Sequence, residues 1–193
     1  DRILLGKKNA GLTQKPGELE KTSYHEAGHA MLSLLQPEYP YQFHKVTILA
    51  RGGALGVSHS LPIADQTGFS KESMEAMICV SLGGRAAEQV IFNHIHTGAS
   101  SDFRNATKIA QEMVMIYGMD ENIGMVSYLE CRKISSETKR EIDLAIKSIL
   151  DICYKKAVSM LTKNKAKLKK LAKELLEKET LDSEAVKNIL KIK

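Results

Sequence analysis

The spacing of hydrophobic residues changes from helical to strand-like and back along this chain. Apolar residues recur every three or four positions over residues 18–36, which is typical of an amphipathic helix, and Pro37 ends it. Apolar and polar residues then alternate over 43–50 and 55–61, with Gly52 and Gly53 between the two runs. This pattern predicts two strands that form a β-ribbon.

A long helical pattern follows the ribbon. It covers residues 70–92, and Ser70 is its expected N-cap. Gly83 and Gly84 interrupt the pattern, at a cost in helix propensity of about 1 kcal/mol each. The glycine pair therefore indicates either a break in the helix or a place where another helix comes very close.

The rest of the chain is predicted to be helical with one irregular stretch. The expected elements are a helix capped by Ser100 or Ser101 that stops at Gly118, an irregular segment 119–134 with a short strand at about 125–129, a long helix from Ser135 or Ser136 to about residue 162, a helix over 165–178, and a short final helix capped by Asp182. We therefore expect a mainly α fold with a small β-ribbon or sheet, which is an α+β class.

Composition and charge exclude several classes of protein. The chain is 43% hydrophobic and 26% charged, which is typical of a globular protein, and no apolar run approaches the length of a membrane span. The net charge of +5 comes mostly from 155–178, where nine lysines meet two acids. No arginine or aromatic residue interleaves with these lysines, so we interpret them as a solvated helix face and expect no nucleic-acid partner.

The three cysteines, Cys79, Cys131 and Cys153, include no CxxC pair and are expected to be buried free thiols.

The stretch YHEAGH, residues 24–29, carries the strongest chemical signal. On a helix, His25 and His29 lie one turn apart on the same face, so both imidazoles can reach one metal ion. Glu26 is rotated away from that face, where it can act as a base toward a water molecule that the metal activates. The same five-residue pattern also occurs by chance in unrelated helices, and an assembly module with an inactive metal site is the alternative; the presence of Glu26 argues against it.

The spacing leaves the third ligand open. His44 and His59 lie in the predicted ribbon, where solvent-facing histidines are expected, and His94 and His96 lie in a loop. Two acids are better candidates. They are Glu88 on a predicted helix and Asp102 near a predicted helix start, and spacing alone does not choose between them.

Four motifs in order resemble one known family. The stretches YHEAGHA, HKVTILARGGALGVSHSLP, GGRAAEQVIF and TGASSDFRNATKIAQEMV are similar to the peptidase domain of FtsH-type ATP-dependent zinc metalloproteases. The opening DRILLG resembles the segment that joins the ATPase module of that family to its peptidase domain, and the end of the chain resembles the family's end. The resemblance covers nearly the whole sequence.

The resemblance implies roles for particular residues. It implies one Zn²⁺ per chain with His25, His29 and Asp102 as ligands, Glu26 as the catalytic base, and Glu88 as a residue that orients a ligand imidazole. The family often has Glu at the position of Gln89 and Asn at that of Ser101, and neither departure removes a ligand.

The resemblance also implies a larger machine. Residues 1–17 are then a linker from an upstream AAA+ ATPase module, and 18–193 are the zinc peptidase domain, with a catalytic part at 18–134 and C-terminal helices at 135–193. The full-length protein would be a homohexamer that degrades unfolded or misassembled membrane and soluble proteins, held by upstream transmembrane segments at the cytoplasmic face of the inner membrane if it is bacterial. The sequence contains no GxxxxGK[ST] motif, so ATP would act only through the upstream module.

The ribbon has an expected role in substrate binding. An extended polypeptide can add to an exposed strand edge through main-chain hydrogen bonds, regardless of its sequence. Our candidate edge consists of Gly53, Ala54, Leu55, Gly56, Val57, Ser58 and His59. The alternative is a strand that only packs against the helix that carries the two histidines.

Overall fold

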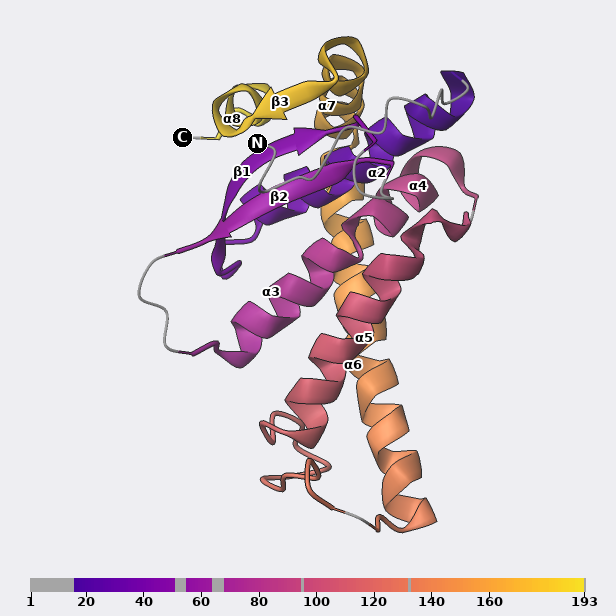
Figure 1. Ribbon diagram of the computed structural model, residues 1–193, viewed down its shortest axis with the longest axis vertical. Helices are drawn as coiled ribbons and strands as arrows, with labels where there is room; N and C mark the ends of the chain where they lie inside the picture. Colours follow the sequence, from indigo (N-terminus) through magenta and orange to yellow (C-terminus); the bar gives the residue numbers. More distant parts are fainter. Residues whose placement is uncertain (1–15, 51–54, 64–67, 95, 132, 193) are drawn as a thin grey trace.

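A computed structural model describes residues 16–50, 55–63, 68–94, 96–131 and 133–192 (Figure 1). Nearly all of the expected linker 1–17, the turn at Gly52 and Gly53, and Ala54 lie outside the described residues. The described elements are α2 (Pro16–Leu35), β1 (Tyr41–Thr47), β2 (Val57–Pro62), α3 (Lys71–Ser81), α4 (Gly83–Phe92), the 3₁₀ turn η1 (Thr97–Ala99), α5 (Ser100–Met115), α6 (Ser136–Lys163), α7 (Lys165–Lys178), β3 (Thr180–Asp182) and α8 (Ser183–Leu190). The mainly α fold with a small sheet is confirmed. No described helix is both long and apolar enough to cross a bilayer.

The sheet has three antiparallel strands in the order β2-β1-β3. Val46 on β1 pairs with Ser58 on β2 and with Leu181 on β3, so the predicted ribbon is confirmed and a third strand joins it. Sequence reasoning missed β3 because three residues are too few to show an alternating pattern. Among the described residues β2 pairs with β1 alone, so it forms one edge of the sheet.

The glycine pair marks both a break and a close approach. Leu82 separates α3 from α4, and α4 packs against α2 where Gly83 meets Gly28. A Cβ atom added at Gly28 would lie 2.4 Å from the Gly83 carbonyl oxygen, which no real side chain tolerates. The two helices can therefore be this close only because Gly28, the fifth residue of YHEAGH, has no side chain.

Two hydrophobic clusters hold these elements together, and α6 runs through both. One cluster joins α2, the sheet, α7 and α8, and it includes Ala157 and Leu161 of α6. The other joins α3 and α5 to the earlier half of α6 through residues such as Ile149. The helices after residue 135 thus share their core with the part before it (Figure 1), and the domain division at residue 135 stays a prediction.

Three expectations were wrong. Ser100 already has helical backbone angles (φ −64°, ψ −34°), so neither it nor Ser101 caps α5; the cap position is Ala99, without a side-chain hydrogen bond. Residues 125–129 form no strand, because the Tyr128 N–H donates to the Met115 carbonyl at the end of α5 instead of pairing with a strand. Cys131 is exposed on that same irregular segment, whereas Cys79 and Cys153 are buried free thiols as expected.

Candidate metal centre

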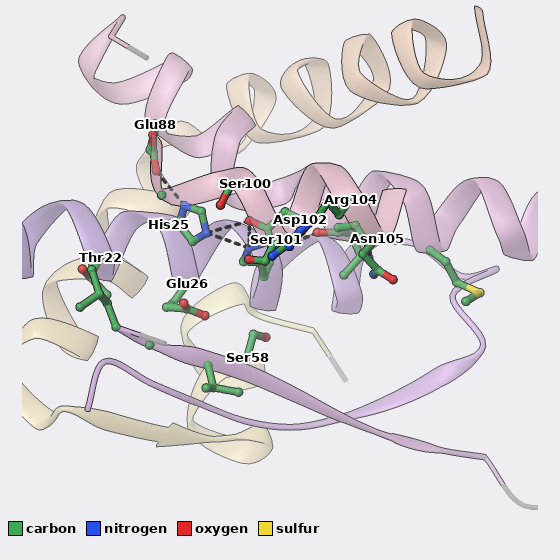
Figure 2. A pocket seen from close by; sticks show the side chains of 18 of the residues that line it. Thr22, His25, Glu26, Ser58, Glu88, Ser100, Ser101, Asp102, Arg104 and Asn105 are labelled. Carbon is green, nitrogen blue, oxygen red and sulfur yellow. Dashed lines mark hydrogen bonds and ion pairs between the residues drawn. The ribbon is translucent and has the colours of Figure 1, made fainter. Parts of the chain in front are cut away.

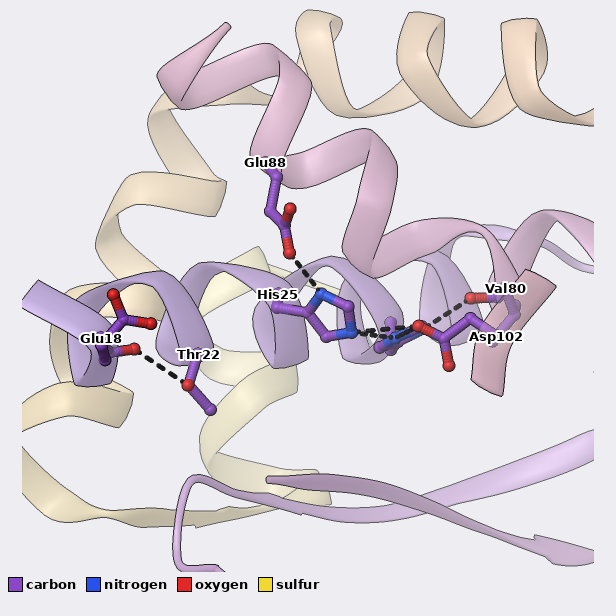
Figure 3. A network of polar contacts seen from close by, with 7 residues as sticks. Glu18, Thr22, His25, Val80, Glu88 and Asp102 are labelled. Carbon is purple, nitrogen blue, oxygen red and sulfur yellow. Dashed lines mark hydrogen bonds and ion pairs between the residues drawn. The ribbon is translucent and has the colours of Figure 1, made fainter. Parts of the chain in front are cut away.

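Side chains from two helices meet at one point beside the sheet. His25 and His29 are four residues apart on α2, which places them on one face of that helix. Asp102 comes from the first turn of α5 and points toward His25 (Figure 3). The His25 Nε2 atom lies 3.1 Å from His29 Nε2 and 3.1 Å from Asp102 Oδ2, and His29 Nε2 lies 3.5 Å from Asp102 Oδ2. In a tetrahedral zinc site with bonds of about 2.0–2.1 Å, ligand atoms are about 3.3–3.4 Å apart. The carboxyl group that meets both imidazoles is therefore that of Asp102, and the spacing suits a small divalent ion.

The other nitrogen of each imidazole is held by an acceptor. His25 Nδ1 lies 2.7 Å from Glu88 Oε1, and His29 Nδ1 lies 2.7 Å from the Val80 carbonyl oxygen (Figure 3). A carboxylate and a carbonyl oxygen only accept, so both Nδ1 atoms carry the hydrogen and both Nε2 atoms turn toward Asp102. Glu88 thus contacts the Nδ1 side of His25, a candidate ligand, which is the position that the resemblance implies for it.

The donor set fits a cation. Asp102 Oδ2 is buried, and it lies 3.1 Å from His25 Nε2 and 3.5 Å from His29 Nε2. Two imidazole nitrogens facing each other at 3.1 Å, next to a carboxylate, form a cluster of electron-pair donors. His25, His29 and Asp102 form the one group of three potential ligands found among the described residues, and His94 and His96 are not part of it.

In the metal-free centre, the positive charge comes from a proton on His25. Burial disfavours the charged form of His25, but the hydrogen bonds with Asp102 and Glu88 outweigh burial and raise the pKa of His25 to about 10. Burial would raise the pKa of Asp102, but the hydrogen bonds from His25 and His29 hold it well below its usual range. The metal-free centre is therefore a protonated His25 between two carboxylates.

Zinc binding to the metal-free protein should tighten as the pH rises. The raised pKa keeps His25 protonated throughout the neutral range, so a zinc ion must displace that proton before Nε2 can act as a ligand. As long as the pH is below the His25 pKa of about 10, each rise of one pH unit should therefore strengthen the apparent zinc affinity about tenfold. Titration of the metal-free protein against a chromophoric chelator at two pH values near neutrality measures this slope. Equal dissociation constants at both values would contradict it.

Gly84 provides the space that the His25 imidazole occupies. A Cβ atom at Gly84 would lie 2.4 Å from both Cε1 and Nε2 of His25. Sequence reasoning noted the glycine pair as a close approach between helices, and the structure shows that a side chain also fits against it. The two glycines therefore have different roles: Gly83 lets α4 approach α2, and Gly84 leaves space for the imidazole of a candidate ligand.

Replacing Gly84 by alanine should weaken zinc binding by about tenfold or more, because the added methyl group would displace the His25 imidazole from the position in which Nε2 faces the other candidate ligands. Alanine is the better helix former by about 1 kcal/mol, so poorer helix formation cannot explain a loss. Zinc affinity measured by chelator competition tests this, with Gly68→Ala as the matched control because nothing lies within 4 Å of a Cβ atom there. An unchanged affinity in Gly84→Ala would show that the ring can move without harm.

Glu26 lies on the other side of the centre, between α2 and β2 (Figure 2). Its carboxylate is buried and accepts a hydrogen bond from the Ser58 backbone on β2. Burial raises the pKa of Glu26, while the nearby His29 and His25 oppose the rise. A carboxylate with a raised pKa beside a metal centre is suited to take up and release a proton.

Gly56 leaves room for this carboxylate. A Cβ atom at Gly56 would lie 2.6 Å from Glu26 Cγ and 2.8 Å from Glu26 Oε1. Gly56→Ala should therefore move the Glu26 carboxylate, lower kcat by about tenfold or more, and leave zinc affinity unchanged, because no ligand atom is touched. Zinc affinity and peptide cleavage measured on the same preparation test this pair of outcomes. A parallel loss of zinc would mean that Gly56 supports the ligands rather than Glu26.

The centre opens into a groove of about 1370 Å³. The residues that line the groove include Leu55, Gly56, Val57 and Ser58, together with residues from the first turns of α5. Gly53 and Ala54 of the candidate substrate edge lie outside the described residues. His59 does not line the groove; its ring lies 6.2 Å from that of His44 on the neighbouring strand.

A mainly α fold with an HExxH helix, an acidic candidate for the third ligand and a groove along a sheet edge is typical of a metallopeptidase domain. The chain belongs to peptidase family M41, whose family model matches residues 13–189. It is 39% identical over 203 residues to an ATP-dependent zinc metalloprotease FtsH of Rubrobacter xylanophilus, covering 98% of this chain and 31% of that protein. It is 41% identical over 192 residues to the chloroplastic or mitochondrial ATP-dependent zinc metalloprotease FTSH 11 of Arabidopsis thaliana, covering 98% of this chain and 23% of that protein. The chain thus spans less than a third of the length of these two relatives.

Proposed function

We propose that this chain is the zinc endopeptidase domain of an ATP-dependent protease. The observation that supports it most is the convergence of two imidazole nitrogens and one carboxylate oxygen within 3.5 Å of one another, with Glu26 beside them. The names of the relatives agree with it, since they are zinc metalloproteases.

His25, His29 and Asp102 would hold the zinc ion. When bound, zinc would lower the pKa of a coordinated water to about 7 and polarise a peptide carbonyl group. Glu26 would accept the proton of the attacking water and deliver it to the leaving amine, a role for which its buried position and raised pKa are suited. Glu88 and the Val80 carbonyl would keep the two imidazoles in the orientation that presents Nε2.

The substrate would bind as an extended strand along β2. Among the described residues this strand pairs only with β1, and residues 55–58 line the groove beside the centre. The Ser58 backbone donates to Glu26, which couples the substrate edge to the catalytic base. Main-chain pairing needs an extended polypeptide, so unfolded proteins and flexible peptides are the expected substrates.

The remaining functions belong to the larger protein. Both relatives are named as ATP-dependent, and this chain covers 31% of the one and 23% of the other. We place an ATPase module, membrane anchoring and assembly into a homohexamer in those additional parts, with the peptidase domain at the cytoplasmic face of the membrane if the source is bacterial. In this arrangement ATP drives unfolding and the described groove only cleaves.

A comparison of two substrates tests the proposal. Zinc-loaded protein, both as this chain and within the full-length protein, should cleave unstructured casein, and a chelator should stop cleavage until zinc is restored. A stably folded protein should be cut only by the full-length protein with ATP. Casein cleavage that persists at the full rate after complete removal of metal would contradict the proposal.

A further inference from the structure

A second buried charge lies on α4 one turn before Glu88. The Arg85 side chain is 8% exposed, and its guanidinium carbon lies 6.0 Å from the centre of the Phe103 ring. Arginine is always charged in proteins, so this position carries a cation with little access to water. Arg85 is not among the residues that line the groove.

Arg85 and Glu88 each have one unsatisfied polar atom. Arg85 Nη1 and Glu88 Oε2 are both buried, and neither has a hydrogen-bond partner among the described residues. Glu88 is 4% exposed, and its other oxygen receives the His25 Nδ1 hydrogen at 2.7 Å. Each group has a partner elsewhere, Arg85 at the Tyr154 hydroxyl and Glu88 at the His25 imidazole, so one polar atom of each group is left to be satisfied.

The two groups have complementary charge and suitable spacing. They are three residues apart on α4, a spacing at which side chains on a helix are neighbours. They also share surroundings: burial raises the pKa of the Tyr154 hydroxyl, Arg85 opposes that rise, and Glu88 adds to it. The Tyr154 hydroxyl in turn donates to the Gln89 amide oxygen.

We propose that Arg85 is a positioning residue of the metal centre, whose guanidinium binds the outer oxygen of Glu88 and thereby holds that carboxylate against the His25 imidazole. The proposal rests on the metal site described above, but not on peptidase activity. Arg85, Glu88 and His25 then form one chain of contacts that ends at the metal. Removing the hydrogen-bond partner of a ligand imidazole typically weakens metal binding about 10–100-fold. Glu88 would be that partner, and Arg85 would act through Glu88.

A double-mutant cycle on zinc affinity tests the proposal. The variants are Arg85→Met, Glu88→Gln and their combination, with Arg85→Lys to restore the charge and Arg140→Met as the control, because Arg140 is exposed on α6. Zinc dissociation constants come from chelator competition at fixed pH, and circular dichroism of the metal-free proteins checks folding. If Arg85→Met does not fold, Arg85→Gln takes its place in the cycle, since it removes the charge and keeps a hydrogen-bond donor.

The expected result is a loss of zinc affinity of about tenfold in Arg85→Met and in Glu88→Gln, and no further loss in the combination. Arg85→Lys should recover part of the loss, and Arg140→Met should match the wild type. Wild-type affinity in the uncharged Arg85 variant, or multiplication of the two losses in the combination, would overturn the proposal. Zinc binding by the wild type without any peptide cleavage would refute the proposed function instead and leave the role of Arg85 standing.

Discussion

Replacing Glu26 by glutamine should abolish peptide cleavage and leave zinc bound. The amide has nearly the shape of the carboxylate but cannot accept a proton, and general-base catalysis contributes about 10²–10⁴-fold to rate. The candidate ligand atoms are Nε2 of His25, Nε2 of His29 and Oδ2 of Asp102, so none of them changes. Cleavage of a fluorogenic unstructured peptide and zinc content of the same sample measure the two outcomes.

The matched control is Glu141→Gln, an exposed glutamate on α6 far along the chain from the groove residues. It should keep both zinc and wild-type activity. Glu26→Gln with activity within about threefold of wild type would remove Glu26 from the role of base, since the smallest contribution expected of such a base is about 10²-fold.

Replacing Asp102 by alanine should release zinc and abolish cleavage together. Asp102 Oδ2 is the one carboxylate oxygen within 3.5 Å of both imidazole Nε2 atoms among the described residues. Removing a metal ligand should weaken zinc binding more than removing a hydrogen-bond partner of a ligand, which costs about 10–100-fold. We therefore expect zinc affinity to fall by more than about 100-fold. Chelator competition measures the affinity, and the peptide assay at saturating zinc measures the remaining rate.

Asp143→Ala is the control for this change, because Asp143 is exposed on α6. Glu88→Ala is the informative comparison. Its carboxylate contacts His25 Nδ1 rather than Nε2, so zinc affinity should fall less than in Asp102→Ala. If Asp102→Ala kept full zinc affinity and Glu88→Ala lost it, Glu88 would be the metal ligand and Asp102 would not.

Local patterns predicted those features that depend on local physics. Helical spacing placed His25 and His29 on one face of α2, and the observed helix begins and ends within two residues of the predicted one. Side-chain caps were correct at Ser70, at Ser135 (one of two candidates) and at Asp182, where a hydroxyl or carboxylate accepts from the backbone N–H three residues later.

Features that depend on tertiary contacts could not be predicted from spacing. The choice between Glu88 and Asp102 depends on how α4 and α5 pack against α2, and only the resemblance favoured Asp102 in advance. The acceptor for His29 is the main-chain carbonyl of Val80, which has no side-chain signal at all. The start of α5 was misplaced because η1 runs directly into it and leaves both serines inside helical turns.

The function of Gly56 and Gly84 shows why glycines are difficult to interpret from sequence. Each gives space to a side chain far away in the chain, Glu26 and His25 respectively, rather than to a turn of its own. Neither has a positive φ in the structure, so conformational freedom does not explain them. The physical reason is the close approach of another element, which becomes visible only when the helices and the sheet are assembled.

An anomalous difference map at the zinc edge, from crystals of the zinc-loaded protein, would test the metal centre most directly. The expected map has one strong peak at about 2.0–2.1 Å from His25 Nε2, His29 Nε2 and an Asp102 carboxylate oxygen, with Glu88 still behind His25. A peak coordinated by Glu88 in place of Asp102, or no ordered zinc between the two imidazoles, would contradict it.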